Sequence, residues 1–295
     1  MMQKRITGAG VAIITPFTQT GEVDYTALEA LVQMHIDCGT DFLCVHGTTG
    51  ETPTLTLEEK RETRKRIIKQ VAGRMPIMLG VGGNNTAAVV NELRTEDLEG
   101  IDAILSIVPY YNKPTQEGIY QHFKAIAAAT PLPVYLYNVP GRTGVNMSPE
   151  TTLRLANDCE NIVGLKAASG NIEQISRLIA MKPKDFVVLS GDDSLTVTIM
   201  KNGGEGVVSV FANAFPAELA ELVHAAAEGR FDEAERLDAK YAALYRLLFV
   251  DGNPAGAKAV LGIMGKCENV LRLPLVPATS ETMNQMSAEI DNLLK

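Results

Sequence analysis

The sequence contains no tryptophan, only four cysteines and no long block of basic residues. The missing tryptophan excludes no class of protein. Cys38, Cys44, Cys159 and Cys267 are far apart and show neither a CxxC pair nor the Cys/His spacing of a metal site. In a chain of 295 residues this usage is typical of reduced thiols, and we expect no disulfide framework.

Long hydrophobic runs are also missing. No stretch approaches the roughly 18 apolar residues that span a bilayer, and the first ten residues lack the apolar core of a signal peptide. The formal net charge is −8, with acidic and basic residues mixed along the chain. We therefore expect a cytoplasmic protein that binds neither nucleic acid nor a membrane surface.

Several common site motifs are absent. The sequence has no GxGxxG, P-loop, HExxH or GxSxG, which argues against the usual nucleotide, zinc-peptidase and serine-hydrolase sites. His35, His122 and His224 fall on segments with helical patterns, so no histidine cluster predicts a metal site. Asp192 and Asp193 could bind a metal, but such acidic pairs more often cap helices.

Short apolar runs alternate with amphipathic segments along most of the chain. Runs that are apolar almost throughout are typical of parallel strands covered on both faces. The segments between them carry helix signals, such as a capping box of Thr56 and Glu59 and a Ser148–Pro149 start. The expected strands lie at 10–16, 41–47, 76–82, 102–109, 133–139, 161–167, 185–191 and 205–211.

Eight strand–helix units in series predict an α/β fold, the (β/α)8 TIM barrel, over residues 1–228. A doubly wound open sheet is the alternative on the same pattern. Helical patterns at 231–249, 254–265 and 280–294 predict an appended C-terminal helical region over residues 229–295. Active sites of such barrels lie at the C-terminal ends of the strands, where we expect the functional residues.

Lys166 ends the apolar run NIVGLKA and is a candidate nucleophile. A lysine at a strand end can also extend toward water or pair with a carboxylate. Inside a barrel, however, loss of solvent disfavours the ammonium form and makes the neutral amine available. Because such an amine can form a Schiff base with a carbonyl compound, the position predicts imine chemistry.

Three further features could complete a site. Tyr137 lies beside Lys166 on the preceding strand and could move protons, although a packed core tyrosine is the alternative. Strand alternation places Tyr135 on the same face, so only its greater distance from the strand's C-terminal end disfavours it. The GTTG turn at 47–50 could hold a carboxylate. Arg142 could bind a second carboxylate or form a surface salt bridge.

These residues carry a resemblance. GTTGE (47–51), PYYNKP (109–114), YNVPGRTG (137–144), GLKAASG (164–170) and LSGDD (189–193) resemble the dihydrodipicolinate synthase family of class I, pyruvate-dependent aldolases, which includes N-acetylneuraminate lyase. The resemblance covers nearly the whole chain. It implies condensation of pyruvate with L-aspartate-4-semialdehyde to 4-hydroxy-tetrahydrodipicolinate, in diaminopimelate and lysine biosynthesis. It also implies no metal or organic cofactor, and a homotetramer built from tight dimers.

The resemblance assigns the proton-transfer residues. Lys166 would form the imine with pyruvate, and Tyr137 would act as the general acid/base. Protons would pass through Thr49 to Tyr111, which in this family comes from the neighbouring subunit. Each site would then need a second copy of the chain.

The resemblance also assigns the binding residues. Backbone N–H groups of Thr48 and Thr49 would hold the pyruvate carboxylate, and the main chain near Val208 would complete the pocket. Arg142 would bind the carboxylate of the semialdehyde. Sugar-acid lyases of the family usually lack this arginine, so its presence favours the synthase. Another pyruvate aldolase, or a binding protein without catalysis on the same barrel, is the alternative.

Two departures from the family pattern concern regulation and the imine. Lysine-inhibited bacterial members carry histidine or glutamate at the positions occupied here by Leu57, Lys60 and Ala88. A lysine ammonium would meet fewer acceptors there and a like charge, so we expect weak or absent feedback inhibition. Ala167 stands where a glutamate is usual, and its effect does not follow from the sequence.

Overall fold

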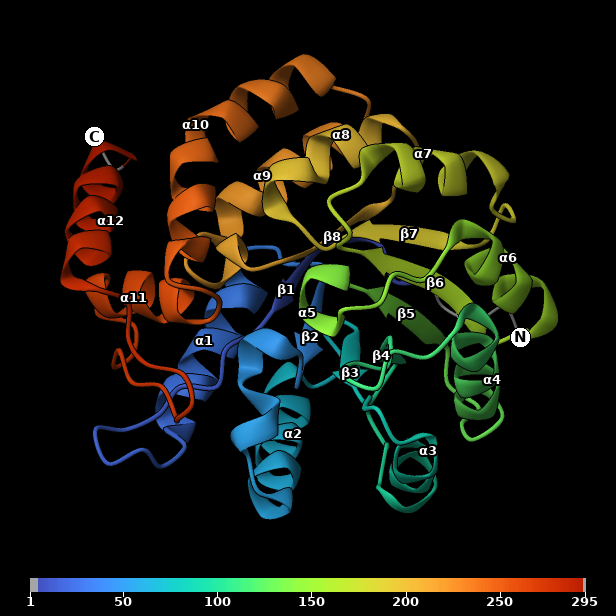
Figure 1. Ribbon diagram of the computed structural model, residues 1–295. Coiled ribbons are helices and arrows are strands. Elements are labelled where there is room, and N and C mark those ends of the chain that lie inside the picture. The colour runs from blue at the N-terminus through green and yellow to red at the C-terminus, as the bar shows by residue number, and fades with distance from the viewer. Residues whose placement is uncertain (1–4, 294–295) are drawn as a thin grey trace.

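Eight parallel strands close into a barrel in the computed structural model, which describes residues 5–293 (Figure 1). Each strand pairs with its neighbours in chain order, and β1 pairs with β8 to complete the ring. The predicted TIM barrel is confirmed, and the alternative of an open doubly wound sheet is wrong. The strands are β1 Gly8–Ala12, β2 Phe42–Val45, β3 Ile77–Gly80, β4 Ala103–Ile107, β5 Val134–Asn138, β6 Ile162–Ala167, β7 Val187–Ser190 and β8 Gly206–Ser209.

Helices surround the strands as an outer layer (Figure 1). Within residues 5–293, no helix is both long enough and apolar enough to cross a bilayer. The α-helices are α1 Tyr25–Asp37, α2 Leu57–Val71, α3 Thr86–Thr95, α4 Gln116–Ala127, α5 Pro140–Thr143, α6 Pro149–Asp158, α7 Ile172–Met181, α8 Thr196–Lys201, α9 Pro216–Ala227, α10 Phe231–Val250, α11 Ala255–Ile263 and α12 Ser280–Leu293. Short 3₁₀ turns are η1 Thr48–Gly50, η2 Thr52–Thr54, η3 Asp193–Leu195 and η4 Phe211–Asn213.

Two predicted helix starts are confirmed in detail. At α2, Thr56 Oγ1 accepts from the N–H of Glu59 at 3.1 Å, and the Glu59 carboxylate accepts from the N–H of Thr56 at 2.9 Å. At α6, Ser148 is the N-cap and Pro149 occupies the first helical position. Both caps satisfy N–H groups that a helix start leaves without partners, which is why the sequence predicts these boundaries well.

The barrel interior is filled by side chains and is closed at its N-terminal end. Phe42, Met78 and Tyr135 are fully buried there. The Tyr135 hydroxyl accepts from the N–H of Ile6 at 2.8 Å and donates to the carbonyl of Ile6 at 3.1 Å. This pair of hydrogen bonds ties β5 to the segment before β1.

The helices after the barrel pack on its outside. In Figure 1, α10 lies against α9, and α12 lies against α10 and α11. Leu244 and Leu248 of α10 belong to the same hydrophobic cluster as Val207 of β8. The predicted boundary between residues 228 and 229 stays a prediction, since the two regions share this core. The predicted end of the last helix, residue 294, lies outside the described residues.

The segment after β7 forms the 3₁₀ turn η3 followed by the helix α8. The buried Asp193 carboxylate accepts from the N–H groups of Val210 and Phe211, each at 3.0 Å. This contact joins the first turn to the segment after β8. A sequence pattern cannot anticipate it, because the partners lie 17 and 18 residues away.

Candidate active site

Lys166 and Tyr137 face each other near the C-terminal ends of β6 and β5. They are register partners in the sheet, and Lys166 Nζ lies 4.4 Å from the centroid of the Tyr137 ring. Both are buried, with exposed fractions of 6% and 7%. The structure thus brings together the two residues that were predicted to carry the nucleophile and the proton.

The two tyrosines of β5 occupy different ends of the barrel. The hydroxyl of Tyr135 is bound to Ile6 at the closed end. Tyr137 instead lines a cavity of about 270 Å³ among the loops that follow the strands, together with Thr48 and Tyr110. Strand alternation left this choice open, and the structure places only Tyr137 beside Lys166.

No carboxylate pairs with Lys166 in the part of the chain that the structure describes. The lysines in ion pairs there are Lys182, Lys201 and Lys258. Burial raises the pKa of the nearby Cys44 thiol to about 11, and the positive charge of Lys166 opposes this shift. Cys44 therefore stays a neutral thiol near pH 7 and provides no thiolate partner for the lysine.

Gly191, which follows β7, provides room for the Lys166 side chain. A Cβ atom at this position would lie 2.7 Å from the Cβ of Ala168 and 3.1 Å from Lys166 Cε. Close-packed interiors have no space for contacts this short, so a larger residue would clash with Ala168 and crowd the Lys166 side chain. Gly191 was not among the predicted site residues, although its place in the SGDD segment after a strand was a usable signal.

The two threonines of η1 lie in different environments. Thr48 lines the cavity beside Tyr137. Thr49 is 2% exposed, and its hydroxyl accepts a hydrogen bond from Asn253 Nδ2 at 2.9 Å. The predicted proton relay through Thr49 stays a prediction, and Thr48 is the threonine that shares a cavity with Tyr137.

Three other predicted site residues have distinct environments. Val208 is buried in β8 and packs in the interior cluster that includes Tyr137. Arg142 is exposed on α5 and forms no ion pair within residues 5–293, so the surface salt bridge has no support. Tyr111 is 86% exposed on the loop after β4, where its φ is 73°. Within one chain, an aromatic ring this exposed is not part of the buried Lys166 site.

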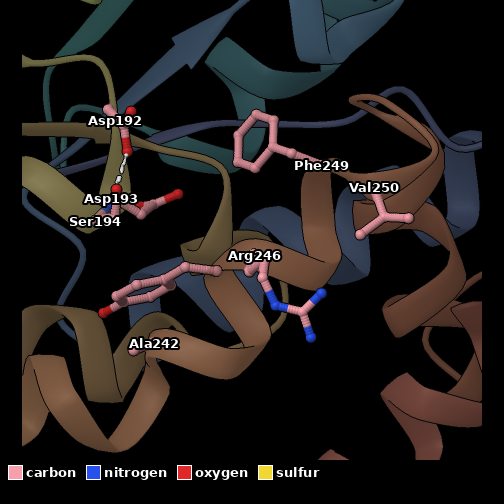
Figure 2. Close-up of a pocket in the computed structure, with 8 residues that line it drawn as sticks. Asp192, Asp193, Ser194, Ala242, Arg246, Phe249 and Val250 are labelled. Carbon is pink, nitrogen blue, oxygen red and sulfur yellow. Dashed lines mark hydrogen bonds between the residues drawn. The ribbon is translucent and has the colours of Figure 1, made fainter. Parts of the chain in front are cut away.

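A second cavity, of about 520 Å³, lies between the segment after β7 and α10 (Figure 2). Asp192 and Ser194 line one side, and Arg246 and Phe249 of α10 line the other. Asp192 Oδ1 accepts from the N–H of Ser194 at 3.0 Å and from its hydroxyl at 2.7 Å, which confirms its role as a helix cap. Among residues 5–293, no group of three or more His, Cys, Asp or Glu side chains could hold a metal ion.

The fold and the comparisons with known proteins show that the chain is a (β/α)8-barrel enzyme. It belongs to the dihydrodipicolinate synthetase family, whose model matches residues 5–293. The family resemblance predicted from the sequence motifs is therefore confirmed.

Similar proteins cover the chain almost completely. A 4-hydroxy-tetrahydrodipicolinate synthase of Phocaeicola vulgatus is 56% identical over 293 residues, 99% of both chains. One of Parabacteroides distasonis is 55% identical over 286 residues, 97% of this chain and 96% of that one. The crystal structure of dihydrodipicolinate synthase from Aquifex aeolicus matches with a TM-score of 0.94, at 43% identity and 97% coverage of both chains.

Proposed function

We propose that the chain is a 4-hydroxy-tetrahydrodipicolinate synthase, which condenses pyruvate with L-aspartate-4-semialdehyde through a Schiff base on Lys166. The observation that carries the proposal is the buried contact of Lys166 with Tyr137 at 4.4 Å, in a barrel without a carboxylate partner for the lysine among the described residues. The 56% identity to a relative of that name, over 99% of both chains, supports the choice of substrates.

The chemistry follows from these two side chains. The Lys166 amine attacks the ketone carbon of pyruvate, and Tyr137 supplies the proton with which the carbinolamine loses water. Loss of a methyl proton then gives an enamine, whose carbon attacks the aldehyde of the second substrate. The amino group of that substrate finally displaces Lys166 and closes the ring. No step in this scheme requires a metal or an organic cofactor.

The binding groups are part of the same proposal. The N–H groups of Thr48 and Thr49 hold the pyruvate carboxylate, and the main chain near Val208 completes the pocket. Thr48 lines the cavity that Tyr137 lines, and Val208 packs in the same interior cluster, which supports both assignments.

A second copy of the chain completes the site in this proposal. Tyr111 receives protons from Tyr137 through Thr49 and belongs to the neighbouring subunit. Its exposed fraction of 86% supports a role in a contact between copies. The enzyme would then be a tetramer built from two tight dimers, and light scattering at micromolar concentration measures this assembly. We place it in the cytoplasm, because all four cysteines are free.

Borohydride trapping tests the function directly. The protein is incubated with pyruvate, reduced with borohydride and mapped by mass spectrometry, and turnover is then compared with aspartate semialdehyde and N-acetylneuraminate. We expect a pyruvate adduct on Lys166 and turnover with the semialdehyde. An adduct on another lysine, or preference for the sugar acid, would refute the proposal.

Arg142→Ala is expected to lower kcat/KM for aspartate semialdehyde by about 10- to 100-fold, because the variant loses a charge-assisted contact with the substrate carboxylate. The pyruvate concentration that gives half-maximal trapping should not change. Arg177→Ala is the matched control, since this arginine is also exposed but pairs with Glu150 on the barrel surface. Equal losses in the two variants, or a weaker pyruvate complex in Arg142→Ala, would contradict the assignment.

L-Lysine is expected to inhibit this enzyme weakly, with no half-inhibition below about 1 mM. Lys60 lines the cavity of about 270 Å³ with Tyr110, and its positive charge disfavours an ammonium ligand there. The side chains of Leu57 and Ala88, at the other two positions that differ from lysine-inhibited members, are apolar and offer no acceptor. Initial rates at increasing L-lysine measure the effect, and half-inhibition in the sub-millimolar range would contradict it.

A further inference from the structure

A second lysine of this chain is buried more completely than Lys166. Lys258 lies in α11, and its side chain and that of Glu51 are both 0% exposed. Lys258 Nζ lies 2.5 Å from Glu51 Oε1, and it donates to the carbonyl of Val270 at 2.8 Å. The ammonium also lies 3.9 Å from the centroid of the Phe17 ring. The Lys258 ammonium is therefore paired inside the protein, although burial outweighs the attraction of Glu51 and lowers the lysine's pKa.

The partner of Lys258 ends the threonine turn. Glu51 follows η1 directly and has φ 50° and ψ 33°, a left-handed conformation that is strained for a non-glycine residue. Its Oε2 accepts from the N–H of Arg272 at 3.0 Å, while its carbonyl accepts from the N–H of Thr54 at 2.9 Å. Such backbone strain persists only where the surroundings fix it, and these contacts supply that constraint.

The same turn has a further anchor from the end of the chain. Asn253 Nδ2 donates to Thr49 Oγ1 at 2.9 Å, one residue before Gly50. Asn253, Lys258 and Arg272 all belong to the region after the barrel. α11 and the connecting segments on either side of it thus hold a turn at the catalytic end of the barrel, from both sides of Gly50.

Stability alone does not account for a buried ion pair. Desolvation offsets most of the attraction, and replacing both partners by apolar residues is often neutral or stabilising, whereas removing one partner is strongly destabilising. An apolar pair would lack the Glu51 carboxylate that accepts from the N–H of Arg272, however, and so would not fix the left-handed end of the turn. The ion pair therefore fixes the position of Glu51 at the end of the turn and does not add net stability to the fold.

We propose that Lys258 is a positioning residue, which acts through Glu51 to fix the Thr48–Thr49 turn for binding the pyruvate carboxylate. This inference rests on the proposed function. A displacement of about 1 Å in a binding group can lower a rate by about 10²-fold. Loss of the pair should therefore weaken pyruvate binding, even though Lys258 contacts no substrate.

The test separates position from stability with two variants, Lys258→Met and Glu51→Gln/Lys258→Met. Borohydride inactivation is measured against pyruvate concentration, and Tm is measured by calorimetry. We expect Lys258→Met to lower Tm and to raise the half-saturating pyruvate concentration at least about tenfold. The double variant should recover Tm but keep the raised half-saturation. Recovery of both quantities would overturn the proposal, because the pair would then be structural only.

Lys182→Met is the matched control. Lys182 pairs with Glu205 at 3.2 Å near the N-terminal end of β8, and we expect a lower Tm with unchanged half-saturation. If Lys258→Met does not fold, Glu51→Gln carries the same prediction for half-saturation, and an unchanged value refutes it. A wild-type protein without an adduct would refute the proposed function and this inference together. If the wild type forms the adduct and the half-saturating pyruvate concentration is unchanged in the Lys258 and Glu51 variants, only this inference is refuted.

Discussion

Lys166→Met is expected to abolish turnover, with a loss of at least about 10³-fold in kcat, because the thioether cannot form an imine. Its Tm should equal or exceed that of the wild type. The wild type keeps an amine on an apolar strand without an acidic partner among residues 5–293, and burying such a group costs free energy. Stability and activity would then move in opposite directions, as expected where a strained or desolvated group serves catalysis.

Steady-state rates and calorimetry measure the two effects, and Lys166→Arg is the informative companion. The arginine keeps a positive charge at the strand end but offers no nucleophilic amine. It should be as inactive as the methionine variant and give no adduct on reduction. Substantial turnover in Lys166→Arg would show that the charge, and not imine formation, is what the reaction needs.

Tyr137→Phe is expected to lower kcat by about 10²- to 10⁴-fold while an adduct with pyruvate still forms. The ring and its packing over Lys166 remain, so the change removes only the hydroxyl that moves protons. Single-turnover trapping distinguishes the two steps, because the imine should accumulate more slowly but reach the same final yield. Unchanged kcat would exclude Tyr137 as the acid/base.

Tyr135→Phe provides the control on the same strand and the same face. Its hydroxyl joins the N–H and carbonyl of Ile6, so its loss should destabilise the fold by about 1–3 kcal/mol. Turnover of the folded fraction should stay near that of the wild type. A large loss of kcat in this variant with little loss of stability would contradict the assignment of Tyr135 to the closed end of the barrel and Tyr137 to the catalytic end.

Much of the fold follows from local pattern. Strands buried on both faces must be apolar almost throughout, and caps such as Thr56 with Glu59 sit next to the helices that they start. Lys166 and Tyr137 could be paired in advance, since consecutive strands of a barrel are neighbours and their C-terminal ends meet at one edge.

The anchors of the threonine turn did not follow from the sequence. Lys258 shows the same signal as Lys166, a single lysine in an apolar segment, and the fold gives the two different outcomes. Lys258 forms an ion pair with Glu51, whereas Lys166 forms none with a carboxylate among the described residues. Contacts such as Asn253 with Thr49 join positions 204 residues apart, and such pairing depends on the whole fold.

The closed N-terminal end of the barrel also determines the order in which the two substrates bind in the proposed reaction. Phe42, Met78 and Tyr135 fill the interior below Lys166, so substrates reach the amine from the loop end alone. Pyruvate must occupy the deeper position before the aldehyde can meet the carbon that attacks it. An aldehyde that arrived first would block the entrance to its own co-substrate, and high concentrations of the second substrate would then slow the enzyme.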